Sequence, residues 1–159
     1  MQDLPPSAAK VAAAAASLGL PIAIRIMPAT TRTAEEAAAA CGTSVGQIVK
    51  SLIFEGSESK TPLLLLVSGK NLVDEKAVAA RIGEGLKRPD AQRVRDITGF
   101  AIGGIPPLGH ASALSAYIDP DLLAYEEVWA AAGTPNAVFP VDPNRLASAI
   151  NATTLPMRP

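Results

Sequence analysis

Cysteine and histidine are almost absent from this chain, since Cys41 and His110 are the only residues of their kinds. A single cysteine cannot form an intramolecular disulfide, and it cannot supply a cysteine-based zinc site. With only one histidine beside it, we expect no metal site and no cofactor. Cys41 itself follows four alanines, a setting more typical of a small buried side chain than of a nucleophile.

An excess of positive charge is also lacking, because 14 Lys and Arg residues stand against 15 Asp and Glu residues. A protein that coats DNA or RNA needs surplus cations to neutralise phosphates, so we expect no general DNA binding. A localised basic patch stays compatible with this charge sum. Aromatic residues make up only 4% of the chain, too few to suggest stacking platforms for single-stranded nucleic acid.

Long apolar runs are missing as well. The leucine-rich run at 63–67 is far too short to cross a bilayer, and the N-terminus lacks the pattern of a signal peptide. These features predict a cytoplasmic protein that makes no contact with membranes. The hydrophobic fraction of 48% excludes a disordered chain, and 159 residues fit one domain, residues 1–159.

The spacing of apolar and turn residues predicts a mixture of helices and strands. Helices are expected at 7–18, 33–40, 74–82, 90–97 and 143–150, and strands at 22–27, 49–55, 62–68, 116–119, 127–132 and 137–141. The helix at 33–40 opens with a capping box, Thr33 and Glu36. The strand at 62–68 should pair with 49–55 and be buried on both faces. Together they predict an α/β fold with one mixed β-sheet surrounded by helices, followed by a frayed tail from about residue 153.

Lys50 is the first candidate for chemistry. In an extended segment it shares one face with the apolar residues Ile48, Leu52 and Phe54. An ammonium in such a row must reach water, find a partner or line a pocket. The alternative interpretation is that the strand begins one residue later and that Lys50 lies at its solvated end.

The glycine- and proline-rich segment at 103–110 is the second candidate. Gly103 and Gly104 let a ligand approach the backbone closely, and their N–H groups could stabilise an oxyanion. The alternative is an ordinary connection between elements. His110 could act as an acid, a base or a hydrogen-bond donor, although a single loop histidine is more often structural. Basic residues also gather at 87–95, where they could contact RNA phosphates or simply be solvated: Lys87, Arg88, Arg93 and Arg95.

Four segments carry a resemblance to a known family. They read SVGQIVKSLIF at 44–54, LLLLVSGKNLV at 63–73, TGFAIGGIPPLG at 98–109 and VWAAAGT at 128–134. In this order they resemble the YbaK proteins and the insertion domain of bacterial prolyl-tRNA synthetases, which are aminoacyl-tRNA editing domains. The resemblance implies a free-standing trans-editing deacylase whose partner is a mischarged tRNA, with an aminoacyl-tRNA synthetase as a further candidate partner.

The resemblance also implies site residues. Lys50 matches the functional lysine of the family, and Ser51 matches a position that often carries a small hydroxyl residue. Residues 103–107 match a Gly-x-x-x-Pro loop beside the aminoacyl end of the substrate. We therefore expect Lys50, Gly103 and Gly104 to be catalytic, and the following to bind substrate: Ser51, Ile105, Pro106, Pro107, Gly109, His110 and Gly133.

The implied substrates carry a small amino acid: alanine, serine, threonine or cysteine. The apolar residues at 129–132 depart from the cysteinyl-tRNA branch of the family, which leaves alanyl, seryl and threonyl esters as the better candidates. An aminoacyl ester needs no protein nucleophile, only a positioned water and a stabilised oxyanion. The alternative function is a non-catalytic module on the same fold that binds nucleic acid or a small molecule.

Overall fold

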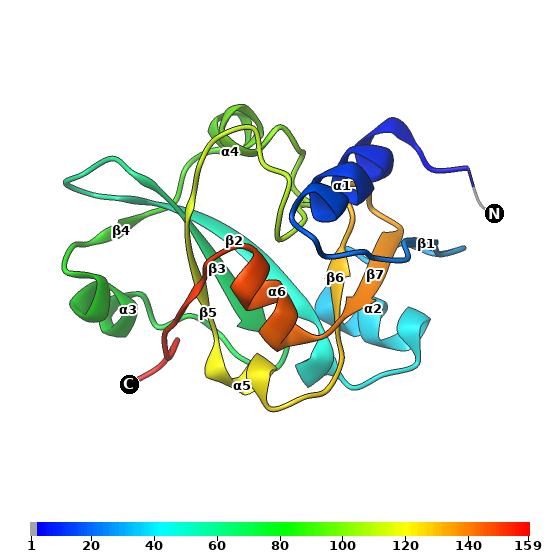
Figure 1. Cartoon of the computed structure of the whole chain (residues 1–159). Coiled ribbons are helices and arrows are strands. Elements are labelled where there is room, and N and C mark those ends of the chain that lie inside the picture. The colour runs from blue at the N-terminus through cyan, green and yellow to red at the C-terminus, as the bar shows by residue number, and fades with distance from the viewer. Residues whose placement is uncertain (1–2) are drawn as a thin grey trace.

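The strands of the chain form two sheets rather than the one sheet expected, as the computed structural model of residues 3–159 shows (Figure 1). The smaller sheet is antiparallel, in the order β1 (Arg25–Ile26), β7 (Ala137–Val141) and β6 (Val128–Ala131). The larger sheet has the order β4 (Leu86–Lys87), β2 (Val49–Gly56), β3 (Pro62–Ser68), β5 (Ser115–Ile118) and β8 (Thr153–Thr154). It is mixed, because β2 runs antiparallel to β3 and β4 while β3, β5 and β8 are parallel. The predicted α/β class is confirmed.

Except for the short helix at 120–123, which was not predicted, the helices lie close to where the sequence predicts them. They are α1 (Pro6–Ser17), α2 (Ala34–Cys41), α3 (Glu75–Ile82), α4 (Ala91–Thr98), α5 (Pro120–Leu123) and α6 (Pro143–Ala149). The capping box of α2 is formed: the Glu36 backbone N–H donates to Thr33 Oγ1 over 3.1 Å, and the Thr33 N–H donates to Glu36 Oε1 over 3.2 Å. These bonds fix the segment that leads into α2, which borders the candidate site. In Figure 1, α1 and α2 lie above and below the smaller sheet.

Two expectations for local structure were wrong. The strand expected at 22–27 is reduced to two residues in β1. The tail expected to fray from residue 153 instead forms β8 beside β5. Beyond β8, Leu155 is 6% exposed and Met157 is 2% exposed. Their spacing of two places both apolar side chains on one face, where burial fixes the extended backbone.

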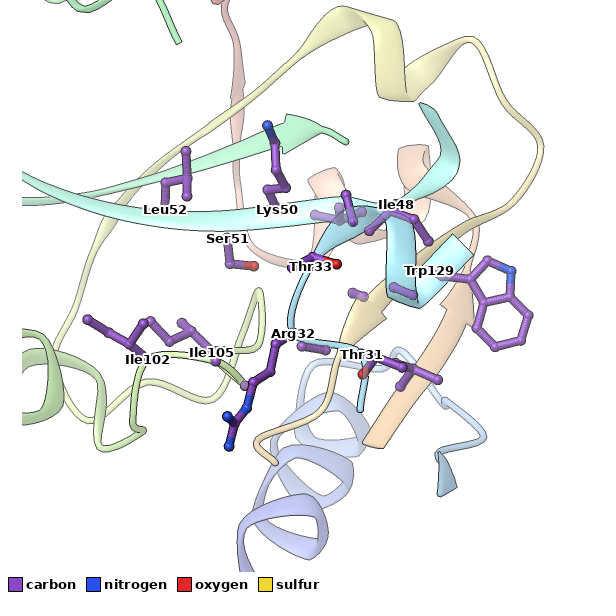
Figure 2. Close-up of a pocket in the computed structure, with 18 residues that line it drawn as sticks. Thr31, Arg32, Thr33, Ile48, Lys50, Ser51, Leu52, Ile102, Ile105 and Trp129 are labelled. Atoms are coloured by element: carbon purple, nitrogen blue, oxygen red, sulfur yellow. The ribbon is translucent and has the colours of Figure 1, made fainter. Parts of the chain in front are cut away.

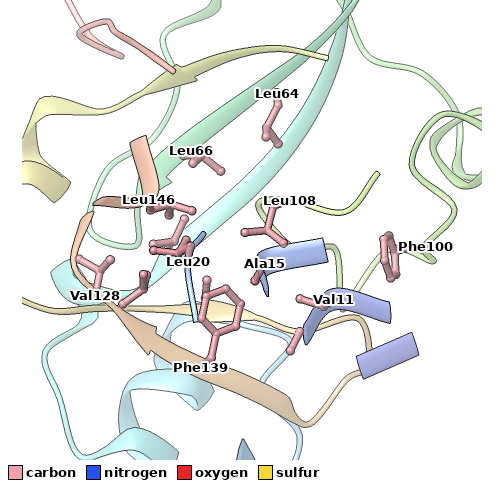
Figure 3. Packing of buried hydrophobic residues seen from close by; sticks show 14 of the residues in the cluster. Val11, Ala15, Leu20, Leu64, Leu66, Phe100, Leu108, Val128, Phe139 and Leu146 are labelled. Atoms are coloured by element: carbon pink, nitrogen blue, oxygen red, sulfur yellow. The ribbon is translucent and has the colours of Figure 1, made fainter. Parts of the chain in front are cut away.

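The larger sheet is buried on both faces because β3 alternates its leucines between two clusters. Leu64 and Leu66 pack in the main core with Val11 of α1 and Phe139 of β7 (Figure 3). Leu63, Leu65 and Val67 pack on the opposite face with Val78 of α3 and Met157 of the tail. The prediction of a strand buried on both faces is confirmed. No helix within residues 3–159 is both long enough and apolar enough to cross a bilayer.

Candidate functional site

A cavity of about 280 Å³ lies between the two sheets, next to the start of α2. Its walls are residues 31–34 and 37 before and within α2, 48–52 of β2, 102–105 of the glycine-rich loop, 129–131 of β6, and 138 of β7. The parallel bridge between Ile48 and Trp129 joins the two sheets at this place. Its volume is near the lower limit of small-molecule sites, so it fits one small group rather than a large ligand.

Five of the residues predicted from the sequence meet in this cavity: Lys50, Ser51, Gly103, Gly104 and Ile105. They come from segments that are some fifty residues apart in the chain, and only the tertiary structure brings them together. The other predicted residues do not line the cavity: Pro106, Pro107, Gly109, His110 and Gly133.

Neighbouring residues of β2 point to opposite sides of the strand. The side chain of Ser51 points toward the side where Ile105 and Arg32 lie, while Lys50 and Leu52 point away from it (Figure 2). The hydroxyl oxygen of Ser51 is buried and has no hydrogen-bond partner within residues 3–159. A buried hydroxyl normally has a partner, so Ser51 brings an unused hydrogen-bonding group to the wall of the cavity.

Lys50 is half-buried, and its ammonium donates to the backbone oxygen of Asn71. The Asn71 side chain is held in turn, because its Nδ2 donates to Asp119 Oδ2 and Asp121 Oδ2 over 2.8 Å each. Burial lowers the pKa of Lys50, and the charges of Glu35 and Asp119 oppose this effect. The prediction that Lys50 shares a face with apolar residues is confirmed, since Leu52 and Phe54 on the same side of β2 pack into the second cluster. A strand position held in this way is not a freely solvated end.

The loop at 102–105, called here the Gly103 loop, brings backbone to the cavity wall. Gly103 has a φ of +106°, a conformation that favours glycine. Gly104 lies so close to the chain at Thr134 that an added Cβ would be 2.8 Å from the Thr134 carbonyl carbon. The Gly133 N–H donates to the Gly104 oxygen over 2.8 Å and ties the two segments together. Within residues 3–159, the Gly103 N–H has no hydrogen-bond acceptor.

His110 stabilises the far end of this segment from outside the cavity. Its Nε2 lies 2.7 Å from the Pro106 oxygen, and its ring meets Phe100 edge-on at 6.5 Å between centroids. Burial lowers the pKa of His110, which favours the neutral ring with Nε2–H as the donor to that carbonyl.

Gly109 and Gly133 do not line the cavity, but they allow close packing of their turns against α1. Both have positive φ values, of +82° and +92°. An added Cβ at Gly109 would be 3.1 Å from the Ala14 Cβ, and one at Gly133 would be 3.0 Å from the Ser7 oxygen. Both glycines therefore let their turns pack against α1, which holds the Gly103 loop in place.

Sequence reasoning missed the polar segment before α2, where Thr31, Arg32 and Thr33 line the cavity. Only Thr33 was noticed, for its role as a helix cap. The run of four polar residues from Thr30 to Thr33 was the available signal, but nothing local shows that it faces residues 102–105. Arg32 is exposed, and its side chain lies beside Gly103, with Nε 3.6 Å from the place of an added Cβ.

Comparisons with known proteins identify the family of this domain. Residues 28–149 match the model of the aminoacyl-tRNA editing domain. The chain belongs to the aminoacyl-tRNA editing domain family. The matched range contains every wall of the cavity, and the family predicted by resemblance is confirmed.

Individual relatives agree with this membership. The chain is 31% identical over 117 residues to the uncharacterized protein YwhH of Bacillus subtilis, which covers 74% of each protein. The structure is similar to that of a proposed trans-editing enzyme for prolyl-tRNA synthetase, with 46% identity, a TM-score of 0.93 and coverage of 99% of both chains. It is also similar to the hypothetical protein APE2540, with 27% identity, a TM-score of 0.82, and coverage of 89% of this chain and 94% of that one.

The basic residues at 87–95 of this editing domain lie outside the cavity. Arg88 pairs with Glu75 over 2.9 Å, and Arg93 pairs with Glu55 over 3.2 Å. These ion pairs match the alternative of a solvated surface better than a phosphate-binding patch. The described residues, 3–159, contain no group of three or more His, Cys, Asp or Glu side chains arranged to hold a metal ion. Cys41 is half-buried, and burial raises the pKa of its thiol.

Proposed function

We propose that this editing domain is a free-standing deacylase that hydrolyses the ester of a tRNA charged with the wrong small amino acid. The observation that carries the proposal is the small cavity in which Ser51 meets the Gly103 loop, within a fold of the aminoacyl-tRNA editing family. The cavity, of about 280 Å³, is at the small end of ligand sites, which suits a small amino acid and its ester. Size would then reject the correct, larger products, as the second sieve of editing requires.

The reaction needs no protein nucleophile, because an aminoacyl ester is already reactive. Water adds to the ester carbonyl and gives up a proton, and the ribose oxygen leaves with the electron pair of the broken C–O bond and takes up a proton to become a hydroxyl. The Gly103 N–H has no acceptor in residues 3–159 and is our candidate donor to the oxyanion, with Gly104 holding the loop against Thr134. Ser51 is our candidate partner for the amino group or the ester of the substrate.

Lys50 is our candidate for a fixed positive charge near the cavity, on the side of β2 opposite to Ser51. Its ammonium carries three N–H groups, and one of them donates to the Asn71 oxygen. Because the ammonium lies on the opposite side of β2 from Ser51, we propose that its charge acts on the cavity across the strand, while the Asn71 contact keeps this charge in one place. Although burial lowers its pKa, we favour this electrostatic role over that of a general base, because the opposing charges of Glu35 and Asp119 favour the protonated form.

The apolar residues in the cavity wall favour some amino acids over others as the esterified group of the substrate. Trp129, Ala130 and Ala131 of β6 present apolar surface, which suits an alanyl ester and offers nothing specific to a thiol. A structural relative is a proposed trans-editing enzyme for prolyl-tRNA synthetase. We therefore place alanyl-tRNA(Pro) first among the substrates, followed by seryl and threonyl esters, with the synthetase as a candidate partner and the cytoplasm as the site of action.

The test is single-turnover hydrolysis of a panel of tRNAs charged with alanine, serine, threonine, cysteine or proline. We expect small residues to be released and proline to be retained. Lys50→Ala should lower the rate by a factor on the order of 100–1000, as the loss of one preorganised contact does, while the protein still unfolds cooperatively on heating. Lys50→Arg should also be impaired, because a planar guanidinium does not replace a compact ammonium.

The matched control is Lys87→Ala, since Lys87 is an exposed lysine away from the cavity. Binding of tRNA without release of any amino acid from the panel would contradict the proposal and favour the non-catalytic module. A folded Lys50→Ala variant with full activity would remove Lys50 from the site. Activity that is lost to chelation and restored by zinc would contradict the metal-free reaction.

A further inference from the structure

Arg32 lies at the cavity, and its positive charge has no partner within residues 3–159. Its side chain is exposed and lines the cavity, and its guanidinium forms no hydrogen bond or ion pair with any residue in the range 3–159. The neighbouring carboxylate of Glu36 is engaged elsewhere, because it accepts hydrogen bonds from the Thr33 N–H and the Thr30 hydroxyl over 3.2 Å each.

Ile102 of the Gly103 loop is unusual because it is a large apolar side chain that is exposed to solvent. It lines the same cavity but is 62% exposed, one of three large hydrophobic side chains that the described chain leaves in solvent. By contrast, Ile105 of the same loop is half-buried, and Leu108, which follows the loop, is 2% exposed. Figure 2 shows Ile102 and Arg32 on the side of β2 toward which Ser51 points. An apolar surface and a cation therefore flank one region of the cavity.

We propose that Arg32 and Ile102 form a subsite for the terminal nucleotide of the tRNA, with Arg32 on its phosphate and Ile102 against its base. This inference rests on the proposed function. The amino acid is esterified to the ribose of the terminal nucleotide, so when the ester lies beside Ser51 and Gly103, the phosphate and base of that nucleotide must lie at the cavity rim.

The chemistry of the two side chains fits these two parts of the nucleotide. A guanidinium presents a planar set of N–H donors that matches phosphate oxygens and can bind them in pairs. The Arg32 side chain also runs beside Gly103, with Nε, Cγ and Cδ between 3.6 and 3.8 Å from the place of an added Cβ. A phosphate held by Arg32 would thus sit close to the backbone proposed to receive the oxyanion. A base covering Ile102 removes its apolar surface from water.

The experiment measures the binding of uncharged tRNA at a series of salt concentrations, so that it needs no hydrolysis. The variants are Arg32→Gln and Ile102→Ser, and the control is Arg95→Gln, an exposed arginine of α4 outside the cavity. Each is tested with whole tRNA and with tRNA from which the terminal nucleotide has been removed. Thermal unfolding of each variant verifies that it is folded.

Arg32→Gln should weaken binding of whole tRNA by about tenfold, as expected for a lost charge-assisted contact. It should also reduce the slope of log affinity against log salt by roughly 0.7, the value for one phosphate contact on a single strand. Ile102→Ser should weaken binding several-fold with the slope unchanged, because it carries no charge. With the shortened tRNA, both variants should bind as the wild type does.

An unchanged slope for Arg32→Gln, or an equal change for Arg95→Gln, would overturn the phosphate contact. Weakening by Ile102→Ser that persists with shortened tRNA would overturn the base contact. The two proposals can fail separately. If no charged tRNA is hydrolysed but the slope and trimming results hold, the deacylase function is wrong and the subsite stands. If hydrolysis occurs and the variants bind like the wild type, only the subsite is wrong.

Discussion

Replacing Gly104 by alanine is the sharpest test of how the Gly103 loop is held. The new Cβ would lie 2.8 Å from the Thr134 carbonyl carbon and 2.9 Å from both the nitrogen and the oxygen of Thr134. All three contacts are with backbone, which cannot turn aside as a flexible side chain can. The loop and the turn at Gly133 must therefore separate, which also weakens the 2.8 Å hydrogen bond from the Gly133 N–H to the Gly104 oxygen.

The expected cost adds two effects. Forcing an extra methyl group into a packed place costs about 1–3 kcal/mol, and the weakened hydrogen bond costs about 1 kcal/mol. We expect Gly104→Ala to lower the free energy of unfolding by about 2–4 kcal/mol. For a chain of this size that corresponds to a drop in Tm of roughly 5–15 °C. Deacylation measured well below that Tm should also fall, because a shift of the Gly103 N–H by about 1 Å can cost on the order of a hundredfold in rate.

Gly103→Ala is the matched control, since it adds the same methyl group one residue earlier. There the Cβ would meet only the Arg32 side chain, at 3.6–3.8 Å, so the cost is the strain of a φ near +106°, about 1–2 kcal/mol. Circular dichroism during heating compares the two variants. If Gly104→Ala has the same Tm as Gly103→Ala, the close approach to Thr134 is not rigid and the reasoning is refuted. If Gly103→Val or Gly104→Val keeps wild-type hydrolysis, the loop has no role in the oxyanion.

Three further outcomes are expected. Ser51→Ala should leave Tm unchanged or slightly higher, because it removes a buried hydroxyl without a partner in the described chain, yet it should slow deacylation; a clear loss of Tm would contradict this. The lowered pKa of His110 means that the unfolded chain binds more protons below about pH 6.5, so its contribution to stability should fall as pH falls through that range; His110→Gln should flatten the acid side of a Tm–pH profile. Deleting residues 153–159 should lower Tm by more than 5 °C, since it exposes the surface covered by Leu155 and Met157; an unchanged Tm would mean that the tail is not part of the core.

The local sequence pattern was enough to predict the helices and strands around the site. The capping box of Thr33 and Glu36, the glycines that end α3 and α4, and the paired strands β2 and β3 all depend on contacts within a few residues, or on burial of one face. The placement of Lys50 opposite Ser51 on β2 follows from the same alternation. The prediction for the tail was wrong because the tail has few apolar residues. These residues stabilise an extended backbone only by packing against α3 and pairing beside β5, which the local sequence does not show.

The amino-acid sequence by itself determined every helix except α5, the main strands, the pairing of β2 with β3 and, through four segments in order, the editing family. These features follow from local periodicity and from motifs that can be recognised without knowing any tertiary contact. Only the tertiary structure decided that the strands divide into two sheets, that the cavity lies between them, and that Arg32 faces the Gly103 loop. It also assigned His110 to a loop carbonyl instead of the cavity. Such juxtapositions join residues tens of positions apart, and their geometry is set by how the two hydrophobic clusters pack, which no local pattern encodes.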